Sequence, residues 1–194
     1  MVEITESNYH EEVEFRNVEH SKQKLVGMKF ELCRFINCDF SNTDMADTTF
    51  VECTFVNCNL SLANVTKTAF NEVRFSKCKL LGIDFSKCRE FLLSFSFTEC
   101  ILSSCSFGNL KIGGTQFDKC VMHDTQFVNT ELIGCSFDDC DLRDAFFDHS
   151  TLSKADFRNA NNYAIDPEIN RTKGAIFSRI GLEGLLVKYG LDIR

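Results

Sequence analysis

The chain has 194 residues, of which 44% are hydrophobic and 25% are charged. These proportions are typical of a soluble globular protein and exclude a disordered or membrane-spanning one. With 21 basic and 28 acidic residues, the formal net charge is −7, which argues against direct binding to nucleic acid or to a phosphate surface and favours a basic protein partner.

The first segment, residues 1–12, precedes any repeat. The opening stretch MVEITESNYHEEVEF carries five glutamates and no basic residue before Arg16. It therefore lacks the basic and apolar regions of a signal or transit peptide, and no apolar run of 18 residues follows that could span a membrane. We expect a cytoplasmic protein, in which the eleven cysteines stay reduced.

A five-residue period dominates residues 13–161. Apolar residues recur at every fifth position from Phe15 to Phe85, with His20 as the one exception. After a slip of two residues near Glu90, the series resumes at Leu92 and runs to Phe157. A period of five fits neither an amphipathic helix nor a half-exposed strand. We infer that the chain turns a corner every five residues.

A small residue lies two positions before most of these central residues. Cys33 precedes Phe35, Thr48 precedes Phe50, and all eleven cysteines occupy this slot if Cys88 is counted in the register before the slip. Positions two apart in an extended segment point to the same side, so both residues point inward. Four residues separate pairs such as Cys33 and Cys38, a spacing also found in zinc sites. Because cysteine packs as a small apolar residue, we interpret all eleven as core residues and predict no metal and no cofactor.

The residue type also repeats every twenty positions, as in the series Phe97, Phe117, Phe137 and Phe157. Four five-residue sides then make one square coil, and stacked coils pair in parallel so that like side chains form ladders. The sequence predicts an all-β solenoid of about seven coils. The slip near Glu90 predicts a bulge or small loop on one edge.

Three segments, CRFINCDFSNTDM, CTFVNCNLSLANV and CDLRDAFFDHSTLSKADFRNA, resemble the pentapeptide-repeat family, whose pattern is Ala-(Asp/Asn)-Leu/Phe-x-x. The resemblance covers roughly residues 13–161 and implies a right-handed quadrilateral β-helix. The chain departs from the family pattern in three ways: Cys or Thr often replaces Ala, His20 occupies a central position, and the slip interrupts the series near Glu90.

Residues 162–194 leave the repeat and contain the only proline. Ser178 is suited to begin a helix and Gly190 to end one. Apolar residues follow Ser178 at helical spacing: Leu182, Leu185, Leu186 and Tyr189. Because a solenoid must cover its last rung, we predict a short capping α-helix. Its apolar face predicts a two-fold homodimer through this end.

Two further resemblances concern function. NYAIDP with GAIFS and the leucine-rich tail resemble the C-terminal ends of quinolone-resistance members of the family, and SLANV with LLGIDF resembles their middle. In those relatives the end forms a symmetric dimer, and the protein binds DNA gyrase or topoisomerase IV as a DNA mimic. The plasmid-borne relatives also carry long loops. This sequence lacks them apart from the slip, so no loop residue can be transferred.

Acidic residues concentrate between Glu131 and Asp156, where there are seven acids and two bases. Five aspartates of this stretch are candidate partner contacts: Asp138, Asp139, Asp141, Asp144 and Asp148. We interpret them as an acidic strip that offers negative charge to a protein groove built for DNA. The alternative is a solvated face that keeps solenoids from stacking end to end.

Nothing in the sequence indicates catalysis. It has no glycine-rich phosphate loop, no HExxH and no GxSxG motif, and a narrow rod filled by its own side chains offers no cleft. We therefore predict no catalytic residue. Two functions stay open: a DNA-mimic protein that binds a type II topoisomerase and protects it from quinolones, or an interaction scaffold of the same fold with an unrelated partner.

Overall fold

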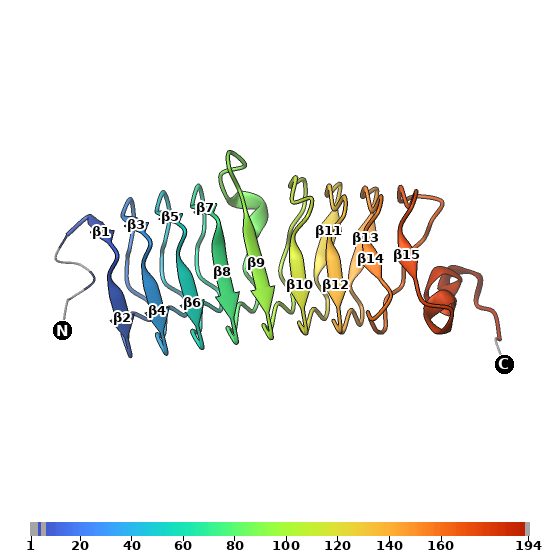
Figure 1. Ribbon diagram of the computed structural model, residues 1–194, viewed down its shortest axis with the longest axis horizontal. Helices are drawn as coiled ribbons and strands as arrows, with labels where there is room; N and C mark the ends of the chain where they lie inside the picture. The colour runs from blue at the N-terminus through green and yellow to red at the C-terminus, as the bar shows by residue number, and fades with distance from the viewer. Residues whose placement is uncertain (1–3, 5–6, 193–194) are drawn as a thin grey trace.

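The computed structural model describes Ile4 and residues 7–192, which form one straight rod of stacked coils (Figure 1). Each coil takes about twenty residues and has four sides, which we number in chain order from the first coil. Side 1 is residues 8–12, side 2 is 13–17, side 3 is 18–22 and side 4 is 23–27, and later coils repeat this order. The predicted all-β solenoid is confirmed.

All strands pair in parallel with the equivalent side of the next coil. On side 1 the strands are β1 (Tyr9–Glu11), β3 (Lys29–Glu31), β5 (Thr49–Val51) and β7 (Ala69–Asn71). Side 2 carries β2 (Glu14–Arg16), β4 (Arg34–Ile36), β6 (Thr54–Val56), β8 (Val73–Ser76), β9 (Phe95–Thr98), β10 (Gln116–Asp118), β12 (Ser136–Asp138), β14 (Asp156–Phe157) and β15 (Ile176–Phe177). Side 4 carries β11 (Gln126–Val128) and β13 (Phe146–Asp148). Where no strand is formed, isolated parallel β-bridges join the equivalent sides of consecutive coils.

The core is a set of side-chain ladders, and the longest lies inside side 2. It consists of nine phenylalanines whose rings stack at centroid distances of 4.5–5.4 Å: Phe15, Phe35, Phe55, Phe75, Phe97, Phe117, Phe137, Phe157 and Phe177. This column confirms the predicted inward register. Its nine rungs are separated by eight coils, one more than the seven expected, because pairing continues past residue 161 to β15.

The small slot explains why Cys and Thr replace Ala. The Sγ of Cys58 donates to the carbonyl of Phe35 in the preceding coil at 3.4 Å, and the Oγ1 of Thr43 donates to that of His20 at 2.7 Å. Both side chains fill the space beside the large residue and add a hydrogen bond between coils. All eleven cysteines are buried and free, so their assignment to the core is confirmed.

The corners account for the scarcity of proline. Among the residues that the structure describes, twenty-five other than glycine have positive φ, and they recur at about every fifth position, as Asn37, Asn42 and Asp47 do. This left-handed conformation is costly for most L-residues, but the backbone N–H of Asn37 is fixed by a 3.0 Å bond to Val56 of the next coil. Proline can supply neither the dihedral angle nor the donor.

The slip forms a loop at residues 89–94, which rises from side 1 near the middle of the rod (Figure 1). The prediction that Leu92 is a central inward residue is wrong: Leu92 is 60% exposed with φ 58°, and Phe91 is 81% exposed. Leu93 packs partly on the core, and Phe95 enters the slot normally held by a small residue. The large Phe95 fills the space that the missing central residue leaves.

The C-terminal segment, residues 178–192, contains the 3₁₀ helices η2 (Ile180–Leu185) and η3 (Val187–Tyr189) in place of the predicted α-helix. Another short 3₁₀ turn, η1 (Phe85–Lys87), precedes the loop. The N-cap of η2 is Arg179, not the predicted Ser178, although Ser178 Oγ accepts from the N–H of Gly181 at 3.1 Å. Gly190 is the left-handed C-cap of η3, as predicted.

Close packing on Tyr163 explains the change of helix type. A Cβ at Gly184 would collide with the carbonyl oxygen of Tyr163, and one at Gly181 would collide with its hydroxyl. The two glycines therefore bring the backbone directly onto the tyrosine, and the carbonyl of Gly184 accepts from the N–H of Ile165 at 2.9 Å. These contacts dock the segment on the end of the rod and override helical spacing.

Candidate functional site

The five predicted aspartates lie in one coil, which we call the acidic coil (residues 135–149). Asp138 and Asp139 are on side 2, Asp141 and Asp144 on side 3, and Asp148 on side 4. They therefore wrap around three sides of the rod, at right angles to its axis. Negative charge that extends along the axis of the rod must therefore be supplied by acidic residues of neighbouring coils.

Hydrogen bonds fix three of these carboxylates. Asp141 accepts from the Nε2 of His123 and the Nδ2 of Asn162, each at 2.7 Å. Partial burial acts to raise the pKa of Asp141, but these hydrogen bonds outweigh it and hold the pKa below its usual value. Asp138 accepts from Asn159 at 2.7 Å.

Asp148 accepts from the Nδ1 of its neighbour His149 at 2.8 Å. Asp139 and Asp144 lie at corners with positive φ and are exposed. Neither has a side-chain partner among the described residues, so both carry charge that is free to meet a partner.

Neighbouring coils carry further acids on the same three sides: Asp118, Asp124, Asp156, Asp166 and Glu168. Sequence reasoning counted Asp156 in the acidic stretch without selecting it as a partner contact, and it missed the other four. Some are partly neutralised, since Asp156 pairs with Arg158 at 2.6 Å and Lys188 pairs with both Asp166 and Glu168. The twenty-residue period could have found them, because it places residues such as 118 and 138 on the same side of consecutive coils.

The predicted dimer residues do not share one face. Leu182 is 46% exposed and Tyr189 is exposed, but Leu186 is half-buried and Leu185 packs against the core. The hydroxyl of Tyr189 donates to Glu168 at 2.9 Å. The 3₁₀ geometry has redistributed the apolar side chains that an α-helix would have aligned.

Other apolar residues of the C-terminal segment are more exposed than those predicted. Ile180 is 92% exposed, and Val187 and Leu191 are also largely exposed. The C-terminal segment thus exposes five apolar side chains at the end of the rod, which we call the apolar end surface: Ile180, Leu182, Val187, Tyr189 and Leu191.

An open groove of about 1330 Å³ brings the two predicted regions together. Asp138, Asp139 and Arg158 line it on the side of the rod. Ile180 and Val187 line it on the side of the C-terminal segment. Acidic and apolar side chains therefore face the same space, an arrangement suited to a basic protein segment with apolar residues.

Among Ile4 and residues 7–192, no group of three or more His, Cys, Asp or Glu side chains is placed to hold a metal ion. Burial raises the pKa of the Cys105 and Cys135 thiols to about 12, which removes their nucleophilic thiolate at neutral pH. No helix in the described part of the chain is long and apolar enough to cross a bilayer.

The rod resembles solved structures. Two trypsin-treated variants of QnrB1, a plasmid-mediated fluoroquinolone resistance protein, superpose with TM-scores of 0.61 and 0.60 at 17% and 18% identity. The matches cover 96% and 93% of this chain and 100% and 99% of the others. HetL, a pentapeptide-repeat protein of the cyanobacterium Nostoc involved in heterocyst differentiation regulation, matches at 15% identity and a TM-score of 0.44, covering 87% of each chain. At these identities the likeness shows the fold alone.

A search of curated protein sequences gives no match. Family models do match: one for a pentapeptide repeat region covers residues 28–117, and one for pentapeptide repeats covers 100–139 and 130–161. Together they span the coils in which large and small inward residues alternate every five positions. The chain belongs to the pentapeptide-repeat family.

Proposed function

We propose that this protein works by binding, without catalysis, and that its partner is a type II topoisomerase, which it protects from quinolones in the cytoplasm. The observation that carries the proposal is the concentration of acids on sides 2 to 4 of the C-terminal coils. There the acidic coil and its neighbours present carboxylates along and around a straight rod. An enzyme groove that attracts DNA phosphates attracts the same distribution of charge.

The fold supports the same partner. QnrB1, whose structure superposes on most of this chain, is described as a fluoroquinolone resistance protein. The groove between the acidic coil and the C-terminal segment adds apolar contact to the charge. A binding surface that combines both can distinguish a topoisomerase from other basic proteins, because apolar contact needs a matching shape.

We also propose that the apolar end surface forms a two-fold homodimer. The segment is docked by Lys188, which pairs with Asp166 at 2.7 Å and Glu168 at 2.6 Å, while Ile180 and Leu182 stay exposed. Light scattering in 500 mM salt should show a dimer for the native protein and a monomer for the double variant Ile180→Asp/Leu182→Asp. A native monomer at micromolar concentration would exclude this dimer, and Leu62→Asp, an exposed change far from the end, is the control.

The test of the topoisomerase proposal is a supercoiling assay with purified gyrase, with and without ciprofloxacin. The native protein should bind gyrase at low salt, compete with DNA and relieve the drug's inhibition, and binding should weaken steeply as salt rises. Changing the five predicted aspartates to asparagine keeps their size and removes five charges. Affinity should then fall more than tenfold.

A matched control removes five exposed charges elsewhere by changing glutamates to glutamine: Glu11, Glu12, Glu52, Glu72 and Glu90. This control should retain binding, because these residues lie on side 1 in the other half of the rod. Equal losses in both variants would mean that only net charge matters. If the native protein does not bind gyrase at low salt, the topoisomerase proposal is wrong and the protein is a scaffold for another partner.

A further inference from the structure

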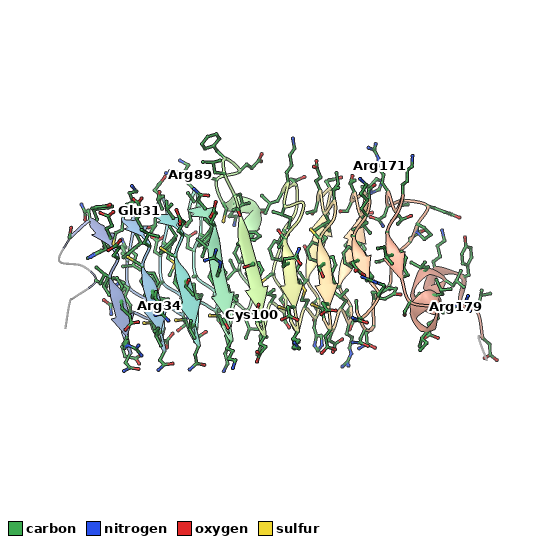
Figure 2. The ribbon with its side chains drawn as sticks, in the orientation of Figure 1. Glu31, Arg34, Arg89, Cys100, Arg171 and Arg179 are labelled. Carbon is green, nitrogen blue, oxygen red and sulfur yellow. The ribbon has the colours of Figure 1, made fainter. Side chains whose placement is uncertain are left out.

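The loop at residues 89–94 divides side 1 into two halves of opposite charge. Before the loop, side 1 presents five glutamates and one lysine: Glu11, Glu12, Glu31, Glu52, Glu72 and Lys29. After the loop, it presents four basic residues and one glutamate: Lys111, Lys154, Arg171, Lys173 and Glu131. Figure 2 shows Glu31, Arg89 and Arg171 along the same edge of the rod, with Arg89 of the loop between the other two.

Most of these charges are not used within the chain. Lys29 pairs with Glu31 at 2.8 Å. Glu52 and Glu72 are exposed and form no salt bridge with any described residue, and the same holds for the four basic residues after the loop. Both halves therefore hold charge that an external surface can neutralise.

The loop lies at the middle rung of side 1 and is apolar at its tip. Four rungs precede it, from β1 to β7, and four follow it, from Lys111 to Arg171. Phe91 is the most exposed aromatic residue of the described chain. The rung after the loop carries Gly113 and Gly114, and a Cβ built on Gly114 would meet nothing within 4 Å. An apolar projection thus stands beside a stretch without side chains.

From this arrangement we infer that side 1 binds side 1 of a second copy of this chain, with the two rods antiparallel. A two-fold axis beside the loop relates the two copies so that their rods run in opposite directions. The acidic half of each copy then faces the basic half of the other. The same axis places Phe91 and Leu92 of each copy against Gly113 and Gly114 of its partner. A parallel arrangement would set like charges against each other, so only the antiparallel pair is self-complementary.

The size of the surface predicts a weak association. With the axis between the loop and the next rung, eight rungs of each copy overlap, so the face is about 34 Å long, and three outward residues make it about 10 Å wide, or roughly 350 Å² per partner. That is about half of a standard interface, so the contact belongs to the weak and transient class. Its stability then depends on the apolar loop at its centre, and its orientation depends on the charges.

This contact is separate from the topoisomerase proposal and from the dimer at the apolar end, since it uses neither the acidic coil nor the C-terminal segment. Phe91→Cys tests it directly, because the axis brings the two loops together. Mild oxidation with copper phenanthroline should link most of this variant into dimers on a non-reducing gel. The native cysteines are all buried, so native protein should stay unlinked.

Leu62→Cys is the matched control, because Leu62 is 61% exposed but lies on side 3. It should give at least tenfold less disulfide dimer than Phe91→Cys. Equal linking of the two variants, or no linking of Phe91→Cys, would overturn the proposal.

A charge exchange tests the orientation. In the Phe91→Cys background, one variant carries Glu31→Lys, Glu52→Lys and Glu72→Lys, and another carries Lys111→Glu, Lys154→Glu and Arg171→Glu. Each alone should lose at least tenfold in linking because both halves of side 1 then carry mostly the same sign of charge, and a mixture should recover a mixed dimer. Failure to recover it, with both variants folded by circular dichroism, would exclude the antiparallel pair.

Discussion

On side 2, the second to fourth coils present Arg34, Thr54 and Arg74 one position before the central phenylalanine, whereas coils after the loop present Asp118 and Asp138 one position after it and Asp156 one position before it. Inside the same side, the phenylalanine column passes from one half to the other without a break, since Phe75 and Phe97 stack at 5.2 Å across the loop. The inward residues are fixed by packing and by pairing between coils. The outward residues are free of both constraints. The two halves can therefore differ in the charge of their surfaces although their interiors are built in the same way.

The largest expected effect tests whether the interiors are equivalent. Phe55→Ala before the loop and Phe127→Ala after it should each lower the free energy of unfolding by about 3–5 kcal/mol, because both rings are buried between two stacked neighbours. Phe146→Ala, an exposed change next to Phe147, should cost less than about 1 kcal/mol. Denaturant unfolding measures all three. A clear difference in the free energy of unfolding between Phe55→Ala and Phe127→Ala would show that the interiors of the two halves are not equivalent.

The end of the rod should respond to a smaller change. Gly184→Ala should cost about 1–3 kcal/mol, since its Cβ would collide with Tyr163. It should also make residues 178–192 more sensitive to limited proteolysis. In Gly108→Ala the nearest atom lies at an ordinary 3.5 Å, so this control should leave both measurements unchanged. An unaffected Gly184→Ala protein would show that the C-terminal segment is not docked on the tyrosine.

The thiols should make stability depend on pH. Burial raises the pKa of Cys105 and Cys135 to about 12, whereas an unfolded thiol ionises near 8.5. Between these values the folded state binds more protons, so stability is complete below about pH 8.5 and falls as pH rises, by up to about 1.4 kcal/mol per pH unit for each thiol. Urea unfolding at pH 7, 9 and 10 measures the slope, and Cys135→Ala should reduce it. Stability that is constant over this range would contradict the inward assignment.

The smallest effect is expected at the boundary between the halves. Leu92→Asn should leave the free energy of unfolding within about 0.5 kcal/mol of the native value, because Leu92 is exposed and asparagine tolerates positive φ. Leu102→Asn, at a buried central position, should be strongly destabilising. A large effect at Leu92 would mean that the loop supports the interior on either side of it.

The interior could be predicted from the sequence because its rule is local: one large and one small inward residue every five positions. The rule fails at the slip, where Phe91, Leu92 and Leu93 are all apolar and the period cannot say which turns inward. It also fails at the C-terminal segment, where contact with Tyr163 replaces helical spacing. The acidic residues were recognised, but their distribution over three sides depends on how the coil turns.

The loop at residues 89–94 shows how this architecture tolerates an insertion. Two extra residues at a corner leave the register intact on both sides, as the pairing of Val73 with Phe95 and Phe75 with Phe97 shows. The extra length is expelled outward because the inward positions are already filled. The corner is thus a natural attachment point for a grafted peptide, which the two flanking coils would hold at a defined height along the rod.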